Sequence, residues 1–298
     1  MSSFIQQLIN GISWGSIYAL IALGYTMVYG IIRLINFAHG DVYMIGAMIG
    51  YYVAILLGSA AGNFSFFVVL PLAMMGCALL GFVIEKLAYK PVRFAPRVTA
   101  LITAIGVSLF LEYGGQLVFG PDPKFFPTLI NTKPLFTFNG VTINNIQVMI
   151  IFTSLILMGL LWFVVMKTKL GRAMRAVSFS HMGASLVGIN VNRVISATFM
   201  LGSALAGAAG VLVGLANPKV EPLMGILPGI KAFVAAVLGG IGSVPGALVG
   251  ALLLGVSETM VTAYLSSTYR DALAFIILIL ILLIKPTGLF GKKGIEKV

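Results

Sequence analysis

Four polar residues that could carry ion or proton chemistry stand between two strongly apolar stretches of this chain. Arg33, Asn36, His39 and Asp41 follow thirty-two residues that include no Asp, Glu, Lys, Arg or His. Ionisable side chains are costly inside a membrane and often mark an ion or substrate pathway. These residues are therefore a candidate gate.

A structural interpretation of the same residues stays open beside the gate. Gly40 permits a sharp backbone turn, and Asp41 is placed to favour the positive N-terminal end of the next helix. Asn36 could satisfy the last carbonyl groups of the preceding helix, and Arg33 could form an ion pair with Asp41. Under this interpretation the motif is a helix break.

The usual chemistry of enzymes is missing from the sequence. His39 and His181 are far apart and lack a metal-ligand spacing, and Cys77, the single cysteine, excludes a disulfide framework. The chain has no phosphate-binding loop, and the glycine-rich run 239–246 has the wrong spacing for a dinucleotide fingerprint. We expect a non-catalytic chain with no cofactor and no metal.

Composition predicts a protein of the lipid bilayer. The chain is 59% apolar and 9% charged, with a mean hydropathy of +1.07, whereas soluble domains are about 25% charged. Its net charge of +11 lies in short clusters between apolar runs, as the positive-inside rule predicts, and does not indicate nucleic acid. We expect one all-helical transmembrane domain over residues 1–298.

About 20 apolar residues cross the membrane as a helix. Eight apolar segments are visible, at about 10–32, 42–57, 64–85, 98–118, 146–166, 194–216, 231–256 and 271–285. The seventh is interrupted by a run that breaks helices, Gly239, Gly240, Gly242, Pro245 and Gly246. We therefore expect a broken or re-entrant seventh segment, which membrane proteins tolerate where it is buried in protein or lines a cavity.

The basic connections set the expected orientation. Residues 86–97, 167–193 and the C-terminal tail are rich in Lys and Arg, so they should be cytoplasmic. Counting back places the N-terminus outside and the 33–41 turn toward the cytoplasmic side, where the short second segment favours a partly embedded turn. Counting forward requires an odd number of crossings after residue 217, which two short helices within 231–256 would supply.

Six stretches follow one another along the chain: "GSIYALIALGYTMVYGIIRLINFAHGDVYMIGA", "AYKPVR", "GRAMRA", "LVGINVNRVI", "KAFVAAVLGGIGSVPGA" and "KPTGLFGKKGIEKV". In this order they resemble the LivH-type permeases of bacterial high-affinity branched-chain amino acid ABC importers. The resemblance covers the chain except the external loop 119–145. It implies a helix bundle similar to type II importer permeases, in the bacterial inner membrane.

The resemblance also implies partners and a coupling loop. The expected partners are a LivM-like second permease, two ATP-binding subunits that hydrolyse ATP, and a periplasmic substrate-binding protein. Permeases of this kind dock on their ATPase through a cytoplasmic loop, here 167–193. Its candidate contacts are Gly171, Arg172, Ala173, Arg175, Ala176 and Gly188. The alternative is an ordinary basic loop beside the membrane.

The function implied is import of leucine, isoleucine and valine. Alternatives are a related importer for urea or short amides, a more distant one for sugars, and a channel or ion-coupled transporter.

Other features are expected to be structural. Gly202, Ala206, Gly210 and Gly214 form a small-residue face, for helix packing within the chain or at a subunit interface. Glu85, Glu112, Glu258 and Asp271 are expected at span ends as interfacial groups, with Lys231 as a snorkelling anchor.

Overall fold

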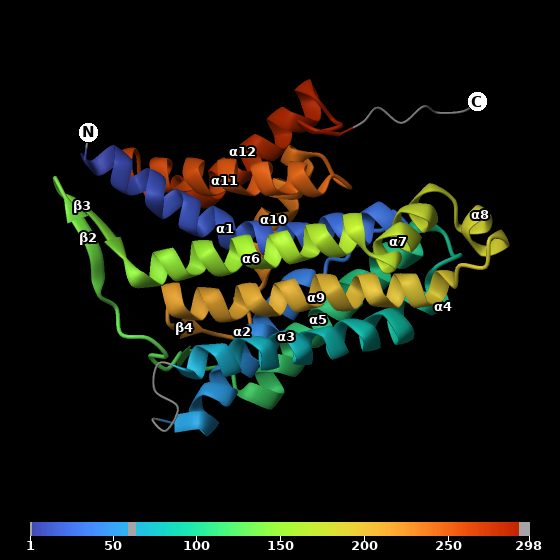
Figure 1. The fold of residues 1–298 in the computed structure, drawn as a ribbon, viewed down its shortest axis with the longest axis horizontal. Coiled ribbons are helices and arrows are strands. Elements are labelled where there is room, and N and C mark those ends of the chain that lie inside the picture. Colours follow the sequence, from blue (N-terminus) through green and yellow to red (C-terminus); the bar gives the residue numbers. More distant parts are fainter. Residues whose placement is uncertain (1, 59–63, 292–298) are drawn as a thin grey trace.

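A computed structural model describes residues 2–58 and 64–291 as a bundle of helices (Figure 1). The long helices are α1 (Ser2–Ile32), α2 (His39–Leu57), α3 (Ser65–Ile84), α5 (Arg97–Phe119), α6 (Asn145–Lys167), α9 (Val191–Ala216), α11 (Val244–Tyr264) and α12 (Tyr269–Ile284). Shorter helices are α4 (Lys90–Val92), α7 (Lys169–Phe179), α8 (His181–Leu186) and α10 (Ile226–Gly239). The predicted all-helical architecture is confirmed. The basic residues Lys292, Lys293 and Lys297 of the tail lie outside the described residues.

Seven helices in the described ranges are long and apolar enough to cross a membrane: α1, α2, α3 with its continuation to Val92, α5, α6, α9 and α11. The continuation after α3 passes through a π-helical turn, Glu85–Tyr89. Helix α12 has 16 residues, which are apolar after Asp271, and α10 has only 14. The chain is a multi-pass membrane protein.

The seventh apolar segment is broken where the sequence predicted. Helix α10 ends at Gly239 and α11 begins at Val244. Gly240 and Gly242 between them have φ of 104° and 93°, a backbone region that side chains with a Cβ rarely adopt. Ser243 then caps α11 by accepting a hydrogen bond from the Gly246 N–H at 3.2 Å.

Helix α9 lies at the centre of the bundle, against α1, α2 and α3. Its small residues allow these close approaches: Gly202 lies against Gly24 of α1, and Gly207 lies against Gly46 of α2 and Cys77 of α3. A Cβ added to Gly46 would stand 2.5 Å from the Gly207 Cα. Of the small-residue face itself, Gly202, Gly210 and Gly214 all lie against other segments of this chain, so the face serves packing within the chain.

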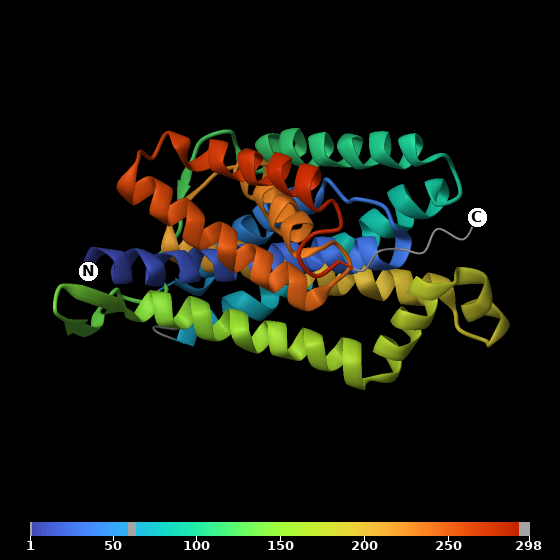
Figure 2. The ribbon, with the colours of Figure 1, turned by 90° about the horizontal axis from the view of Figure 1, so that it is seen from above.

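The connection between α5 and α6 carries short strands. β2 (Pro134–Phe138) and β3 (Val141–Asn144) form an antiparallel hairpin, and β1 (Lys124–Phe125) pairs with β4 (Lys219–Val220). The Thr142 N–H donates a 2.7 Å hydrogen bond to Gln6, so the hairpin lies beside the start of α1. Figure 2 shows α5 and α6 on opposite sides of the bundle.

Candidate functional site at the junction of two short helices

The 33–41 motif follows α1 and folds back into the bundle, so that its buried part lies beside the last third of α1. Residues 33–38 turn the chain back after α1, with Arg33 at a φ of 54°. His39, the first residue of α2, packs its ring on Gly24 and meets the Tyr25 ring edge-on at 4.9 Å between centroids. Gly24 lies eight residues before the end of α1 at Ile32, so the chain folds back into the bundle directly after the turn. The position of the turn toward the cytoplasmic side stays a prediction.

Helix α10 begins at the same place as α2. Gly225, immediately before α10, and Gly229 in its first turn both pack on Gly40. A Cβ on Gly40 would stand 2.9 Å from the Gly229 Cα, so the absence of side chains permits this contact. The N-termini of α2 and α10 therefore meet inside the bundle, an arrangement from which transporters build sites near the membrane centre.

Asp41 faces α5 at this junction. Its carboxylate is 2% exposed and accepts a short hydrogen bond from the Ser108 hydroxyl. The same hydroxyl lies 3.5 Å from a carboxylate oxygen of Glu112, which is 8% exposed. Arg33 is exposed and forms no ion pair among the described residues. The expected ion pair between Arg33 and Asp41 is therefore wrong, and Asp41 belongs to a hydroxyl-linked pair of acids.

Asn36 also has a partner other than the expected one. Its side-chain oxygen accepts a 2.9 Å hydrogen bond from the Tyr89 hydroxyl, both residues being buried. The expected capping of α1 is not formed, and Asn36 instead joins the turn to the π-helical turn after α3. Asn36 and His39 therefore hold the helix break in place.

A second buried polar cluster ties α10 to α1, α11 and α12. The Lys231 ammonium lies 2.9 Å from Glu258, which is an ion-pair distance without the geometry of a hydrogen bond. The same ammonium lies 2.6 Å from Asp271. Glu258 accepts hydrogen bonds from Arg270 at 3.1 Å and from the Tyr18 hydroxyl at 2.9 Å. The cluster contains two cations and two acids, so its formal charges cancel. We call these four ionic residues, Lys231, Glu258, Arg270 and Asp271, the charge quartet.

The quartet corrects the interpretation of Lys231 and Glu258 as interfacial groups, whereas for Asp271, whose side chain is 49% exposed, that interpretation stays a prediction. Lys231 is 6% exposed and Glu258 is 1% exposed, so neither reaches the surface of the chain. Glu85 is also 1% exposed, and it binds Arg93 at 2.5 Å and the Ser196 hydroxyl at 2.6 Å. An isolated buried charge is far more costly than a balanced pair, which explains why these ionic groups occur together.

The predicted coupling loop folds into α7 and α8 at the end of the bundle opposite the hairpin (Figure 1). Gly171 is buried against the last turns of α6, so this glycine serves packing within the chain. Ala173 and Ala176 are half-buried, whereas Arg172 and Arg175 are exposed. Gly188, with a φ of 80°, ends the loop in a turn that favours glycine.

Four large apolar side chains on this loop were not predicted from the sequence. Phe179, Met182, Leu186 and Val187 are 91%, 76%, 81% and 74% exposed. A polar loop with such a group of exposed apolar residues is typical of a protein contact surface. The only signal in the sequence was their position beside the basic residues.

The loop also lies close to the break between α10 and α11. His181 Nε2 is 3.2 Å from the Ile31 carbonyl oxygen at the end of α1. A small cavity of about 100 Å³ is lined by Gly30, Arg175 of α7 and Gly242 of the break. The coupling loop, the end of α1 and the broken segment thus form one neighbourhood.

Comparison with known proteins gives the family. A family model described as the permease component of the branched-chain amino acid transport system matches residues 7–282. The chain belongs to this permease family. The resemblance predicted from the motifs is confirmed, and the family's transport role agrees with the expectation of a chain that is not itself an enzyme.

Individual permeases match along nearly the whole chain. The high-affinity branched-chain amino acid transport system permease protein BraD of Pseudomonas aeruginosa is 45% identical, over 99% of this chain and 98% of the relative. The corresponding protein LivH of Escherichia coli is 43% identical, over 99% and 98%. The ribose import permease protein RbsC of Haemophilus influenzae is 26% identical, over 97% and 87%.

Proposed function

We propose that this permease is the membrane-spanning subunit of an ATP-driven importer of leucine, isoleucine and valine across the bacterial inner membrane. The observation that carries the proposal is the 43–45% identity to permeases of branched-chain amino acid systems along almost the entire chain. The sugar permease shares only 26%. The apolar, glycine-rich bundle is also compatible with an aliphatic cargo.

ATP hydrolysis is assigned to two separate subunits that dock on α7 and α8. Arg172 and Arg175 supply exposed positive charge, and Phe179 and Leu186 supply exposed apolar area. Together they suit a groove with an acidic rim. A LivM-like second permease and a periplasmic substrate-binding protein complete the proposed assembly, as the family resemblance implies.

The proposed orientation has the N-terminus outside and the C-terminus in the cytoplasm. The basic stretches 86–97 and 167–193 both lie at the α7 end of the bundle, which the positive-inside rule assigns to the cytoplasm. After α9, three helices follow, α10, α11 and α12. Together with the residues before it, α10 forms one crossing, so that three crossings follow residue 217 and their number is odd, as the orientation requires.

The meeting point of α2 and α10 is proposed as part of the translocation path. Within the 33–41 motif, Asn36 and His39 hold the break, while Asp41 with Ser108 and Glu112 presents the polar atoms that a passing ammonium group can use. The gate and the helix break are then two roles of one motif, carried by different residues.

Reconstitution tests the proposed function directly. The chain is placed in proteoliposomes with its second permease, ATP-binding subunits and binding protein, and uptake of leucine, urea and ribose is measured with and without ATP. We expect uptake of leucine that requires ATP. Uptake of urea would instead assign the importer to urea and short amides. Uptake of leucine by this chain alone, down a concentration gradient, would reject the ATP-driven mechanism.

A further inference from the structure

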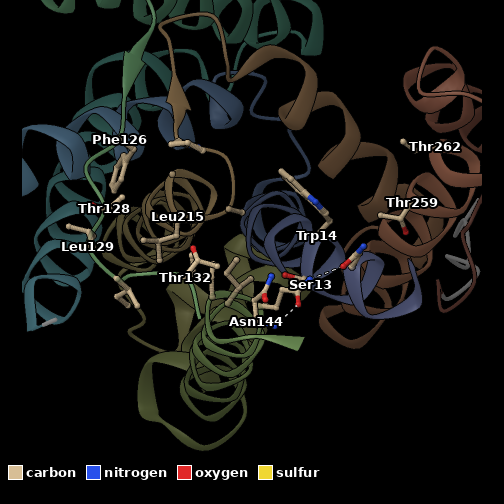
Figure 3. A pocket seen from close by; sticks show the side chains of 18 of the residues that line it. Ser13, Trp14, Phe126, Thr128, Leu129, Thr132, Asn144, Leu215, Thr259 and Thr262 are labelled. Carbon is tan, nitrogen blue, oxygen red and sulfur yellow. Dashed lines mark hydrogen bonds between the residues drawn. The ribbon is translucent and has the colours of Figure 1, made fainter. Parts of the chain in front are cut away.

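A cavity of about 710 Å³ lies at the hairpin end of the bundle (Figure 3). It is bounded by α1, the start of α6, the ends of α9 and α11, and residues 126–132 of the connection before the hairpin. Its volume falls within the range of about 300–1,000 Å³ typical of small-molecule sites. The cavity is separate from the junction of α2 and α10.

The walls of the cavity differ in character. Figure 3 shows Phe126, Leu129 and Leu215 on one side and Thr259 and Thr262 on the other. Ser13 and Trp14 of α1 lie between these two groups. The arrangement offers an aliphatic ligand an apolar wall and offers its polar groups hydroxyl partners.

Arg270 is the only charged side chain among the described residues that line the cavity. Its Nε donates to Glu258 and its Nη2 donates to the Tyr18 hydroxyl at 3.3 Å, and the guanidinium lies 5.1 Å from the Trp14 ring centroid. An arginine has five N–H donors. The remaining donors have no hydrogen-bond partner in the described part of the chain, and the side chain is 34% exposed.

The opposite wall has the opposite polarity. Gly214, Leu215 and Ala216, the last residues of α9, line the cavity. The carbonyl groups of a final helical turn lack partners within the helix and carry the negative end of its dipole. The cavity therefore presents a donor-rich cation and a set of carbonyl acceptors, as a zwitterion requires.

The segment that roofs the cavity is fixed at both ends. The Phe126 N–H donates a 2.6 Å hydrogen bond to the Pro218 carbonyl, and the Asn145 side chain donates to the Asn131 carbonyl at 2.8 Å. Phe126 and Leu129 are 4% and 6% exposed, so they anchor the roof in the bundle. This roof belongs to the one stretch that the family resemblance did not cover.

We propose that the cavity is a holding site for a free aliphatic α-amino acid, with the carboxylate on Arg270. The inference rests on the proposed import function and adds a substrate site within this single subunit. Its ammonium group would meet hydroxyl and carbonyl oxygens, and its side chain would lie on the wall formed by Phe126, Leu129 and Leu215. The roof then contributes to the choice of side chain.

Protection from thiol labelling tests the site in the assembled importer. The natural background is favourable because Cys77, the single cysteine, is buried. Ser13→Cys places a thiol in the cavity with minimal change in size, and Ser267→Cys places one on the exposed turn after α11 as the matched control. Labelling rates with a small membrane-impermeant thiosulfonate are compared with and without leucine, leucinol and 4-methylpentanoate.

We expect leucine to slow labelling at Ser13→Cys by about threefold at twice its Kd, and to leave Ser267→Cys unchanged. Leucinol, which lacks the carboxylate, should protect little. Adding Arg270→Lys, which keeps the charge but loses the planar fork, should weaken protection by leucine. Failure of the reagent to reach Ser13→Cys, or equal protection by leucinol and leucine, would overturn the site.

Uptake by the unlabelled wild-type importer separates this inference from the proposed function. Leucine uptake driven by ATP without protection at Ser13→Cys would remove the holding site and leave the import function intact. Protection without uptake would remove the import function and leave an amino-acid site.

Discussion

Replacing Lys231 with methionine removes one cation from the charge quartet and keeps a side chain of similar length. The lysine ammonium stands 2.9 Å from Glu258 and 2.6 Å from Asp271. Breaking a buried ion pair by removing one partner costs about 3–5 kcal/mol. Two features place this variant at about 3 kcal/mol, the lower end of that range: Arg270 still neutralises Glu258, and the Asp271 side chain is 49% exposed.

Thermal unfolding of the purified protein in detergent measures this loss. With the entropy scaling of globular chains applied to 298 residues, a change of about 3 kcal/mol lowers Tm by roughly 5 °C. The control is Lys219→Met, because Lys219 also lies 2.9 Å from an acid, Glu221, but both side chains are exposed, at 51% and 35%. Surface pairs contribute about 1 kcal/mol or less, so the control should change Tm by about 2 °C or less.

A second substitution tests whether charge balance is the cause. Asp271→Asn added to Lys231→Met leaves one cation and one acid, so the double variant should recover more than half of the lost Tm. Equal shifts for Lys231→Met and Lys219→Met would refute the argument, because burial would then make no difference. Additive losses in the double variant would also refute it, because each side chain would then act by packing alone.

Three further predictions concern the other features of the site. Gly46→Val should force α2 away from α9, because the added Cβ would stand 2.5 Å from the Gly207 Cα. We expect loss of folded protein in fluorescence-detected size exclusion, and normal elution would contradict this. Phe179→Ala should abolish co-purification of the ATP-binding subunits, whereas Phe94→Ala, which truncates an equally exposed phenylalanine at 93%, should not; equal effects would reject α7 and α8 as the docking element. Asp41→Asn should preserve accumulation of the protein in the membrane, measured by immunoblot, and lower leucine uptake. His39→Ala should instead lower accumulation. The reverse pattern would assign the structural role to Asp41 and the transport role to His39.

The sequence predicted the helices and the broken segment because both depend on local chemistry. Apolar runs of about 20 residues form membrane-spanning helices, and Gly240 with Gly242 interrupts such a helix wherever it lies in the membrane. Contacts between distant segments are not local. The sequence placed the 33–41 turn toward the cytoplasmic side and partly embedded, because the second apolar segment is short, but a hydropathy pattern does not show that α2 meets α10 there. The contact that reveals this, between Gly40 and Gly229, joins residues far apart in sequence.

The same limit explains the error over the charge quartet. Lys231 stands at the start of an apolar run, where a surface anchor is the simpler interpretation. Its partners Glu258 and Asp271 lie on two later helices, and only the packing of α10 against α11 and α12 brings the charges together. A basic and an acidic residue at the ends of separate apolar segments therefore give too weak a signal to predict a buried pair.

Helix α1 joins every part of this site. Its residues contact the cavity through Ser13, the quartet through Tyr18, the motif through Gly24 and the coupling loop through Ile31. We expect this row of contacts to transmit a displacement of α7 to the junction of α2 and α10. Because Gly24 leaves the space that the edge of the His39 ring occupies against α1, Gly24→Ala should disconnect the motif from this route while leaving α7 in place. The expected result is ATP-binding subunits that still co-purify but no longer drive leucine uptake.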